Sequence, residues 1–364
     1  MRLRALVLAC AALACAPGTT LSQTRSLYSN LSNPAIGLNG LMAFNVAPDL
    51  DEPYGPHFDA AEVSFVADVD PYWTLWANIA FTFEAVDPEE VWARTTRIPN
   101  IGLTFGKMRA KFGKQALLHA HAFPFVQAPV ISANTLGGEG FKDPGIEADW
   151  LTPVPWFMEL TGGLYLAAEE SEENPLDFGS RAHGNIPFGG HLKNQFDLSD
   201  ETTMEIGFSG LNGKGADGYR RTVYGANLTF RNVPAQRTNQ RGWILQGEYI
   251  GKGHTMDGNF VDEQRGWYGQ FQYRFAQRWW AGLRGEQAFD SYTDVLVDSG
   301  TGDPVSGDIA RGSVNVAWAP SEYSYLRLEY SYLRADDGNG FKPTDQRIML
   351  QASYTIGFHP PHAY

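Results

Sequence analysis

A histidine pair is the feature of this sequence with the clearest metal-binding chemistry. His119 and His121 form an H-x-H motif, and in an extended chain their imidazoles would lie on one side, about 6–7 Å apart. Imidazole is a good zinc ligand, but a zinc site needs at least one further protein ligand. Glu139, His183 and His191 are candidates for it, whereas hydrogen bonds from both imidazoles to the backbone are the alternative.

The segment around this pair also carries a run of cations and a short charged group that closes it. The cations are Lys107, Arg109, Lys111 and Lys114, and the closing group is Glu139, Lys142 and Asp143. If these side chains line a narrow passage, they would select solutes by size and by the local electric field. A solvated basic strand end is the alternative interpretation.

The end of the chain shows what kind of element positions such residues. From Ile348 to Ile356 the apolar residues occupy every second position, and Gln351, Ser353 and Thr355 fall between them. A period of two predicts a β-strand with one apolar and one polar face. Such a strand suits a wall between lipid and water, and we expect it to close a barrel.

About sixteen such segments occur, and the connections between them alternate between short turns and long polar loops. The long connections are 48–57, 110–144, 166–189, 212–220, 251–264, 289–307 and 335–345. Short turns at one end and long loops at the other are typical of outer-membrane barrels. The sequence therefore predicts an all-β protein, an antiparallel transmembrane β-barrel of about 16 strands with short periplasmic turns and long extracellular loops.

Strand alternation also predicts which charged residues face the lumen. They are Glu205, Glu248, Arg274, Arg284, Glu286, Arg327 and Glu329. A charge facing lipid near the midplane costs about 2–4 kcal/mol, so charges confined to one face are informative. Aromatic residues near the short turns, Trp76 and Trp280 among them, predict a girdle at the lipid headgroups.

Domain organisation follows from the first residues and from one long connection. Residues 1–22 have the layout of a cleaved signal peptide. We expect residues 23–38 to be a periplasmic lead-in and residues 39–364 to form the barrel. The connection at about 110–144 is too apolar for an exposed loop, so we expect it to fold into the lumen.

Composition limits the function. The formal net charge is −13, which argues against nucleic acid as a partner. No serine-nucleophile motif or nucleotide-binding loop is present, so we expect no enzymatic activity. The expected location is the bacterial outer membrane, reached through the signal peptide.

Four stretches resemble a known family. They are LSNPAIGLNGLMAFN at 31–45, VDPYWTLWANIAF at 69–81, GKMRAKFGKQALLHAHAFPFVQAPV at 106–130 and YTIGFHPPHAY at the C-terminus. They look like phosphate-selective porins of the O/P kind, a family also labelled zinc-regulated TonB-dependent outer-membrane receptors. The resemblance implies a sixteen-strand barrel, compatible with a trimer, that admits small solutes.

These observations lead to a sequence-based hypothesis. We expect a porin-like channel for passive diffusion of small hydrophilic solutes or ions, with no cofactor. A narrow or closed barrel that acts as a zinc-related receptor or a surface binding protein is the alternative. The expected partners are outer-membrane lipid and lipopolysaccharide, the barrel assembly machinery through the last strand, and two further copies of the chain in a homotrimer.

Overall fold

The computed structural model describes residues 34–46, 55–167, 176, 178–179, 185–215, 217–234, 241–256, 258–297 and 303–357. The strands are β1 (Ala35–Val46), β2 (Gly55–Asp68), β3 (Thr74–Phe81), β4 (Val86–Ile98), β5 (Ile101–Arg109), β6 (Lys142–Leu151), β7 (Phe157–Tyr165), β8 (Phe188–Ser199), β9 (Thr202–Lys214), β10 (Arg220–Asn232), β11 (Gly242–Met256), β12 (Asn259–Ala276), β13 (Trp279–Ser291), β14 (Gly307–Ser321), β15 (Ser324–Asp336) and β16 (Thr344–Gly357). The helices are η1 (Gln115–Leu117), η2 (Ala120–Ala122) and α2 (Val130–Leu136).

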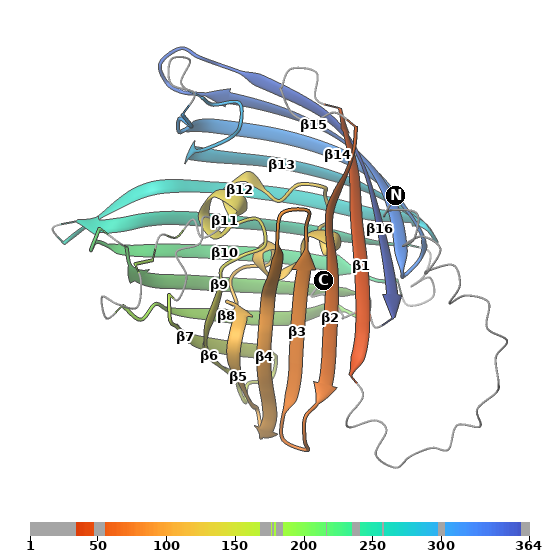
Figure 1. The fold of residues 1–364 in the computed structure, drawn as a ribbon, viewed down its shortest axis with the longest axis vertical. Helices are drawn as coiled ribbons and strands as arrows, with labels where there is room; N and C mark the ends of the chain where they lie inside the picture. Colours follow the sequence, from red (N-terminus) through yellow and green to blue (C-terminus); the bar gives the residue numbers. More distant parts are fainter. Residues whose placement is uncertain are drawn as a thin grey trace, which may run out of the picture.

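The sixteen strands of the described residues form one closed antiparallel barrel (Figure 1). Each strand pairs with its neighbours in sequence, and β16 returns to pair with β1, with Leu350 opposite Phe44. Closure leaves no strand edge with unpaired backbone groups, which is what a β-sheet in lipid requires. The sixteen-strand fold and the closing role of the last strand are therefore confirmed.

The wall has an apolar outside and a polar inside. On β15 and β16, Leu328 and Leu350 are 54% and 44% exposed, whereas Glu329 and Gln351 next to them are 0% and 1% exposed. Successive side chains of a strand point to opposite faces, so the apolar set forms the lipid belt. No helix in the described part of the chain has the length and hydrophobicity to cross a membrane.

The polar inner face is covered by a loop. Residues 110–141 leave β5, fold inside the ring of strands and return at β6 (Figure 1). The helix α2 packs against β11, β12 and β13. Several loop side chains join inward side chains of the wall in one apolar cluster, which includes Phe112, Ile131, Val223, Ile250 and Ile309. The core of this barrel is therefore the loop packed against the inner wall.

Several boundaries differ from the sequence-based ones. The barrel starts at Ala35 and not at 39, because Ala35 to Leu38 pair with β2. The predicted outer connection 251–264 is largely strand, because β11 and β12 continue as a long hairpin, whereas residues 215–219 of the connection 212–220 stay outside the strands. Gly258, with φ of +82°, stands where the long hairpin turns. The signal peptide and most of the lead-in lie outside the described residues.

Two predicted girdle aromatics face the lumen. Trp76 lies on the same face of β3 as buried Asn78, and it stacks on Trp92 of β4 with ring centroids 5.8 Å apart. Trp280 lies on the same face of β13 as buried Arg284, whereas its neighbour Trp279 points outward. Strand side chains alternate, so adjacent Trp279 and Trp280 cannot both face lipid, and Trp76 faces inward because it is two residues from Asn78.

The lipid belt yields a quantitative prediction. We expect Leu328→Arg to lower the free energy of unfolding by about 2–4 kcal/mol, because it places a charge on the lipid face near the middle of β15. Urea unfolding in phospholipid vesicles measures this difference. The control is Ile356→Arg, at the end of β16, where the cost should be about 1 kcal/mol or less. Equal costs at both positions would contradict the proposed belt.

Candidate functional site

The candidate site is the loop of residues 110–141 together with the inner wall that holds it, and wall glutamates bind its backbone. Glu248 accepts hydrogen bonds from the N–H groups of Lys114 and Gln115, both at 3.3 Å. Glu329 accepts one from Val126 at 2.7 Å, and Glu286 accepts one from Val130 at 2.6 Å. A carboxylate that accepts from a backbone N–H makes a strong, charge-assisted hydrogen bond. These three predicted lumen residues therefore anchor the loop.

Two arginines on the same side of the wall bind loop oxygens. Arg284 donates to the carbonyl of Gln127 at 2.7 Å. Arg311 donates to the Gln127 side chain at 2.7 Å and to the carbonyl of Ala128 at 2.6 Å. Both arginines also pair with Glu286. Arg311 was missed at the sequence level, although alternation along β14 with Asn315 would have placed it inside.

Glycines in the wall make room for apolar loop side chains. A Cβ atom on Gly225 would lie 2.9 Å from the ring of Phe112, and one on Gly282 would lie 3.1 Å from the ring of Phe125. Gly113, at φ +56°, brings the loop so close to the wall that a Cβ there would lie 1.5 Å from a carboxylate oxygen of Glu248. Shape as well as charge therefore fixes this loop.

The predicted basic constriction is neutralised by carboxylates. The ion pairs are Lys107 with Asp87 at 3.5 Å, Lys111 with Asp149 at 2.5 Å and with Glu159 at 3.2 Å, and Lys114 with Glu205 at 3.0 Å. Glu205 is thus another wall residue that binds the loop. Lys142 and Asp143, placed in the loop by the sequence analysis, are the first residues of β6, and Asp143 accepts a hydrogen bond from the N–H of Ala167.

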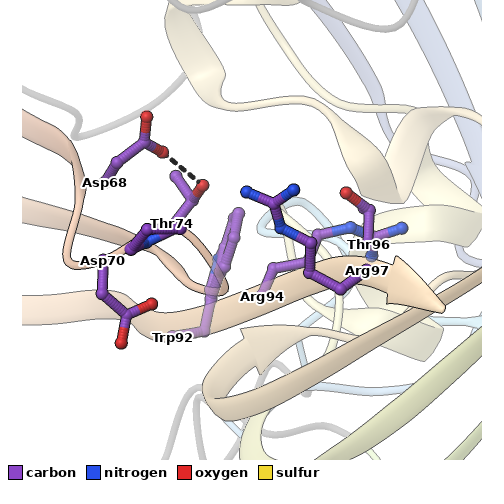
Figure 2. A pocket seen from close by; sticks show the side chains of 8 residues that line it. Asp68, Asp70, Thr74, Trp92, Arg94, Thr96 and Arg97 are labelled. Atoms are coloured by element: carbon purple, nitrogen blue, oxygen red, sulfur yellow. Dashed lines mark hydrogen bonds between the residues drawn. The ribbon is translucent and has the colours of Figure 1, made fainter.

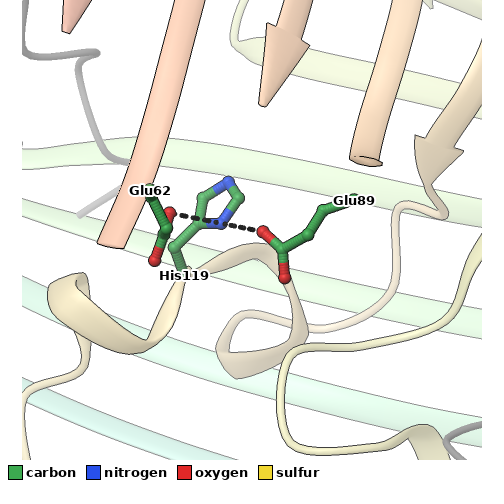
Figure 3. Close-up of side chains that lie close together, drawn as sticks. All are labelled: Glu62, Glu89 and His119. Carbon is green, nitrogen blue, oxygen red and sulfur yellow. Dashed lines mark ion pairs between the residues drawn. The ribbon is translucent and has the colours of Figure 1, made fainter. Parts of the chain in front are cut away.

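The densest charge cluster surrounds His119. Its Nδ1 atom lies 3.3 Å from a carboxylate oxygen of Glu62 on β2 and 3.3 Å from one of Glu89 on β4 (Figure 3). Its Nε2 atom lies 3.5 Å from Glu90. The amide of Asn78 donates to both Glu62 and Glu89, at 3.1 and 2.9 Å. One loop imidazole thus joins two strands on the side of the barrel opposite Glu248.

Three more charged groups complete this cluster. Arg109 lies 3.3 Å from Glu139, and Lys142 lies 3.0 Å from Glu139 and 2.5 Å from Glu89. The loop is therefore clamped near both of its ends, by Arg109 where it leaves β5 and by Lys142 where it enters β6.

Electrostatics favours the charged form of His119. Burial disfavours the imidazolium and so does Arg109, but hydrogen bonds to Glu89 and Glu90 and the charge of Glu62 outweigh them and raise the pKa of His119 to about 9. Burial also opposes ionisation of Glu139, yet Lys142, Arg109 and His119 hold its pKa well below its usual range. At neutral pH both groups are charged, so the cluster is a network of ion pairs.

The structure brings the two predicted zinc histidines together. Their rings stack at 5.6 Å, and each Nδ1 atom approaches a different oxygen of Glu62, at 3.3 Å for His119 and 3.0 Å for His121. Ligand atoms of Glu62, Glu89 and His119 lie within 4.8 Å of one another. The carboxylates supply a donor set that the H-x-H motif alone did not reveal.

Of the predicted third zinc ligands, one lies near His119. Glu139 is near His119, at 3.9 Å. His191 faces β9 and hydrogen-bonds Ser209. His183 lies outside the described residues.

The remaining predicted lumen residues, Arg274 and Arg327, lie nearer the short-turn end of the barrel. Arg274 donates to the carbonyl of Gln277, and Arg327 donates to Gln351 at 3.2 Å. A separate polar pocket of about 590 Å³ opens at this end between the β2–β3 turn and β4, where Asp68, Trp92 and Arg94 line it (Figure 2).

The His119 cluster yields a pH prediction. The folded-state pKa of about 9 exceeds the ordinary 6.5, so the stabilisation, about 3 kcal/mol, is complete below pH 6.5 and is lost as the pH rises through about 9. We expect the free energy of unfolding in vesicles to decrease between pH 6.5 and 9.5. In the His119→Gln variant, the part of this decrease that comes from His119 should be absent.

The matched control is His191→Gln, which should keep the pH dependence of the natural chain because His191 lies outside the cluster. If His119→Gln and the natural chain show the same pH profile, His119 is not held as an imidazolium.

Comparison with known proteins supports the fold. No protein-family model matches the chain. An uncharacterized protein of Aquifex aeolicus (strain VF5) is 26% identical over 348 residues, covering 87% of this chain and 71% of that protein. Among solved structures, the outer membrane channel DcaP of Acinetobacter baumannii aligns with a TM-score of 0.57 at 12% identity, over 89% of this chain and 96% of that one.

Two further structures align over 89% of this chain. The trimer form of the outer membrane protein OmpT of Vibrio cholerae does so over 99% of its own length, with a TM-score of 0.55 at 10% identity. The anion-selective porin from Comamonas acidovorans does so over 100% of its length, with a TM-score of 0.60 at 9% identity. The chain therefore has the fold of the outer-membrane porins.

Proposed function

We propose that this protein is a channel of the bacterial outer membrane for passive diffusion of small hydrophilic solutes, narrowed by residues 110–141. One observation carries the proposal: a closed sixteen-strand barrel holds this loop across its lumen by contacts with β9, β11, β13, β14 and β15 as well as with β2 and β4. A passage of this kind admits solutes by size and by the charges that remain unpaired along it.

Orientation, export and assembly belong to the same proposal. The short turns would face the periplasm and the long loops the outside, with export through a cleaved signal peptide and insertion by the barrel assembly machinery. Outer-membrane lipid and lipopolysaccharide would surround the apolar belt. A homotrimer is supported by the trimer form known for the V. cholerae protein. Transport would follow the solute gradient and involve no covalent chemistry.

The ion pairs around the loop argue against a phosphate-selective porin. A phosphate path needs a ladder of available cations, whereas Lys107, Lys111 and Lys114 each pair with a carboxylate. Ion pairs leave little net field for an anion. We therefore propose a general channel and not a phosphate-specific one.

Single-channel conductance tests the proposal. We expect the refolded protein to give small, stable steps in planar bilayers, because the loop fills much of the lumen. Replacing residues 115–136 by a short Gly-Ser linker should raise the conductance severalfold, since the wall contacts of the loop disappear. A natural chain that never conducts, while the linker variant does, would contradict passive diffusion and favour a closed barrel.

A second candidate, a narrow or closed zinc-related receptor, is favoured by the donor set of Glu62, Glu89 and His119. Zinc must displace the proton of His119, whose pKa is about 9. At pH 7 this displacement costs about 3 kcal/mol, or about a hundredfold in affinity. The nearby positive charges of Arg109 and Lys142 oppose the metal further.

We therefore expect calorimetric titration at pH 7 to show no micromolar zinc binding to the refolded protein. The His119→Gln variant should behave like the natural chain. Zinc binding of micromolar affinity or tighter that both His119→Gln and Glu62→Gln abolish would instead establish the receptor interpretation.

A further inference from the structure

A second chamber lies inside the barrel at the short-turn end, on the side of β10 to β15. It has a volume of about 360 Å³, and the loop residues His121 to Pro124 form part of its lining. This volume is within the range of small-molecule sites in proteins. The chamber is separate from the polar pocket beside β4, with which it shares no lining residue.

The charge in this chamber is of one sign. Arg231, Arg241, Arg274 and Arg327 line it, and no Asp or Glu does. Among the described residues, no ion pair involves Arg231, Arg241 or Arg327. Lys107, Lys111 and Lys114 differ, because each of them pairs with a carboxylate. Here, therefore, Arg231, Arg241 and Arg327 keep their field for a ligand, and that field favours an anion.

Arg327 is the best placed of these cations. It is 7% exposed, it donates one hydrogen bond, to Gln351, and within the described part of the chain its Nε atom is buried without a partner. A buried N–H without an acceptor costs free energy that a ligand oxygen would recover. The guanidinium lies over the ring of Tyr325, 4.7 Å from its centroid, which fixes its plane. A fixed, planar guanidinium suits a carboxylate.

Aromatic side chains supply the rest of the surface. Trp280 and Phe123 line the chamber with Tyr325, and the Arg274 guanidinium lies 5.6 Å from the Trp280 ring centroid. A guanidinium already lies over the Trp280 ring and another over the Tyr325 ring. Phosphate or chloride would leave the rest of this aromatic surface uncovered, whereas a flat aromatic ring would pack against it and gain stacking energy.

From this geometry we infer that the chamber binds a small aromatic carboxylate, with the carboxylate on Arg327 and Arg274 and the ring against Trp280 and Phe123. This inference rests on the proposed channel function, because the chamber is a site for a transported solute only if the barrel conducts. Binding itself does not require conduction, so the two can fail independently.

The test is calorimetric titration of the refolded, full-length protein in detergent with benzoate, benzamide and inorganic phosphate. We expect benzoate to bind, and benzamide and phosphate each to bind at least about tenfold more weakly, because one lacks the charge and the other lacks the ring. The Arg327→Gln variant should lose about tenfold or more in benzoate affinity. The Arg334→Gln variant, which changes an exposed arginine farther along β15, should bind like the natural chain.

The opposite affinities would overturn the inference. Equal affinity for benzamide would show a merely apolar chamber, and equal affinity for phosphate would show a general anion site. If Arg327→Gln does not fold, Arg274→Gln and Trp280→Leu must each weaken benzoate binding, and unchanged affinity in both would refute the site. Benzoate binding by a barrel that never conducts would leave this inference standing and refute the channel.

Discussion

The structure depends on one interaction, the binding of inner-wall carboxylates to the loop of residues 110–141. Glu248, Glu286 and Glu329 accept hydrogen bonds from backbone N–H groups, and Glu205 pairs with Lys114. A buried carboxylate without partners would carry a large desolvation penalty, and so would the loop's backbone groups. The wall carboxylates and the backbone groups of the loop therefore satisfy one another. Together, the wall and the loop form one polar core.

This pairing divides the lumen into regions of different character. Around His119, carboxylates and cations balance in a tight network that ties the loop to β2 and β4. Near the other side, Arg284 and Arg311 are occupied by loop oxygens and by Glu286. Toward the short turns, the guanidinium groups of Arg231, Arg241, Arg274 and Arg327 face a chamber that no carboxylate lines. In the proposed channel, selectivity would follow from the charges that the loop leaves uncompensated.

Much of this could be predicted from local patterns, and some could not. Alternation placed Glu205, Glu248 and Arg284 inside because a strand's geometry is periodic whatever surrounds it. The aromatic character of Trp76 and Trp280 suggested a girdle, although the same alternation places both side chains inside. The cations of the constriction were identified as a group, but their neutralisation was not, because their partners lie on strands up to 91 residues away.

The sequence by itself determined the wall: the period of two, the alternation of short and long connections, and a loop too apolar for water. These are local properties, and barrel closure follows because lipid leaves no strand edge unpaired. Only the tertiary structure decided what the lumen contains. His119 meets Glu62 and Glu89, and Phe123, Trp280 and Arg327 line one chamber, because barrel closure and the path of the loop bring distant residues together. The spacing of these residues along the chain does not indicate that they meet.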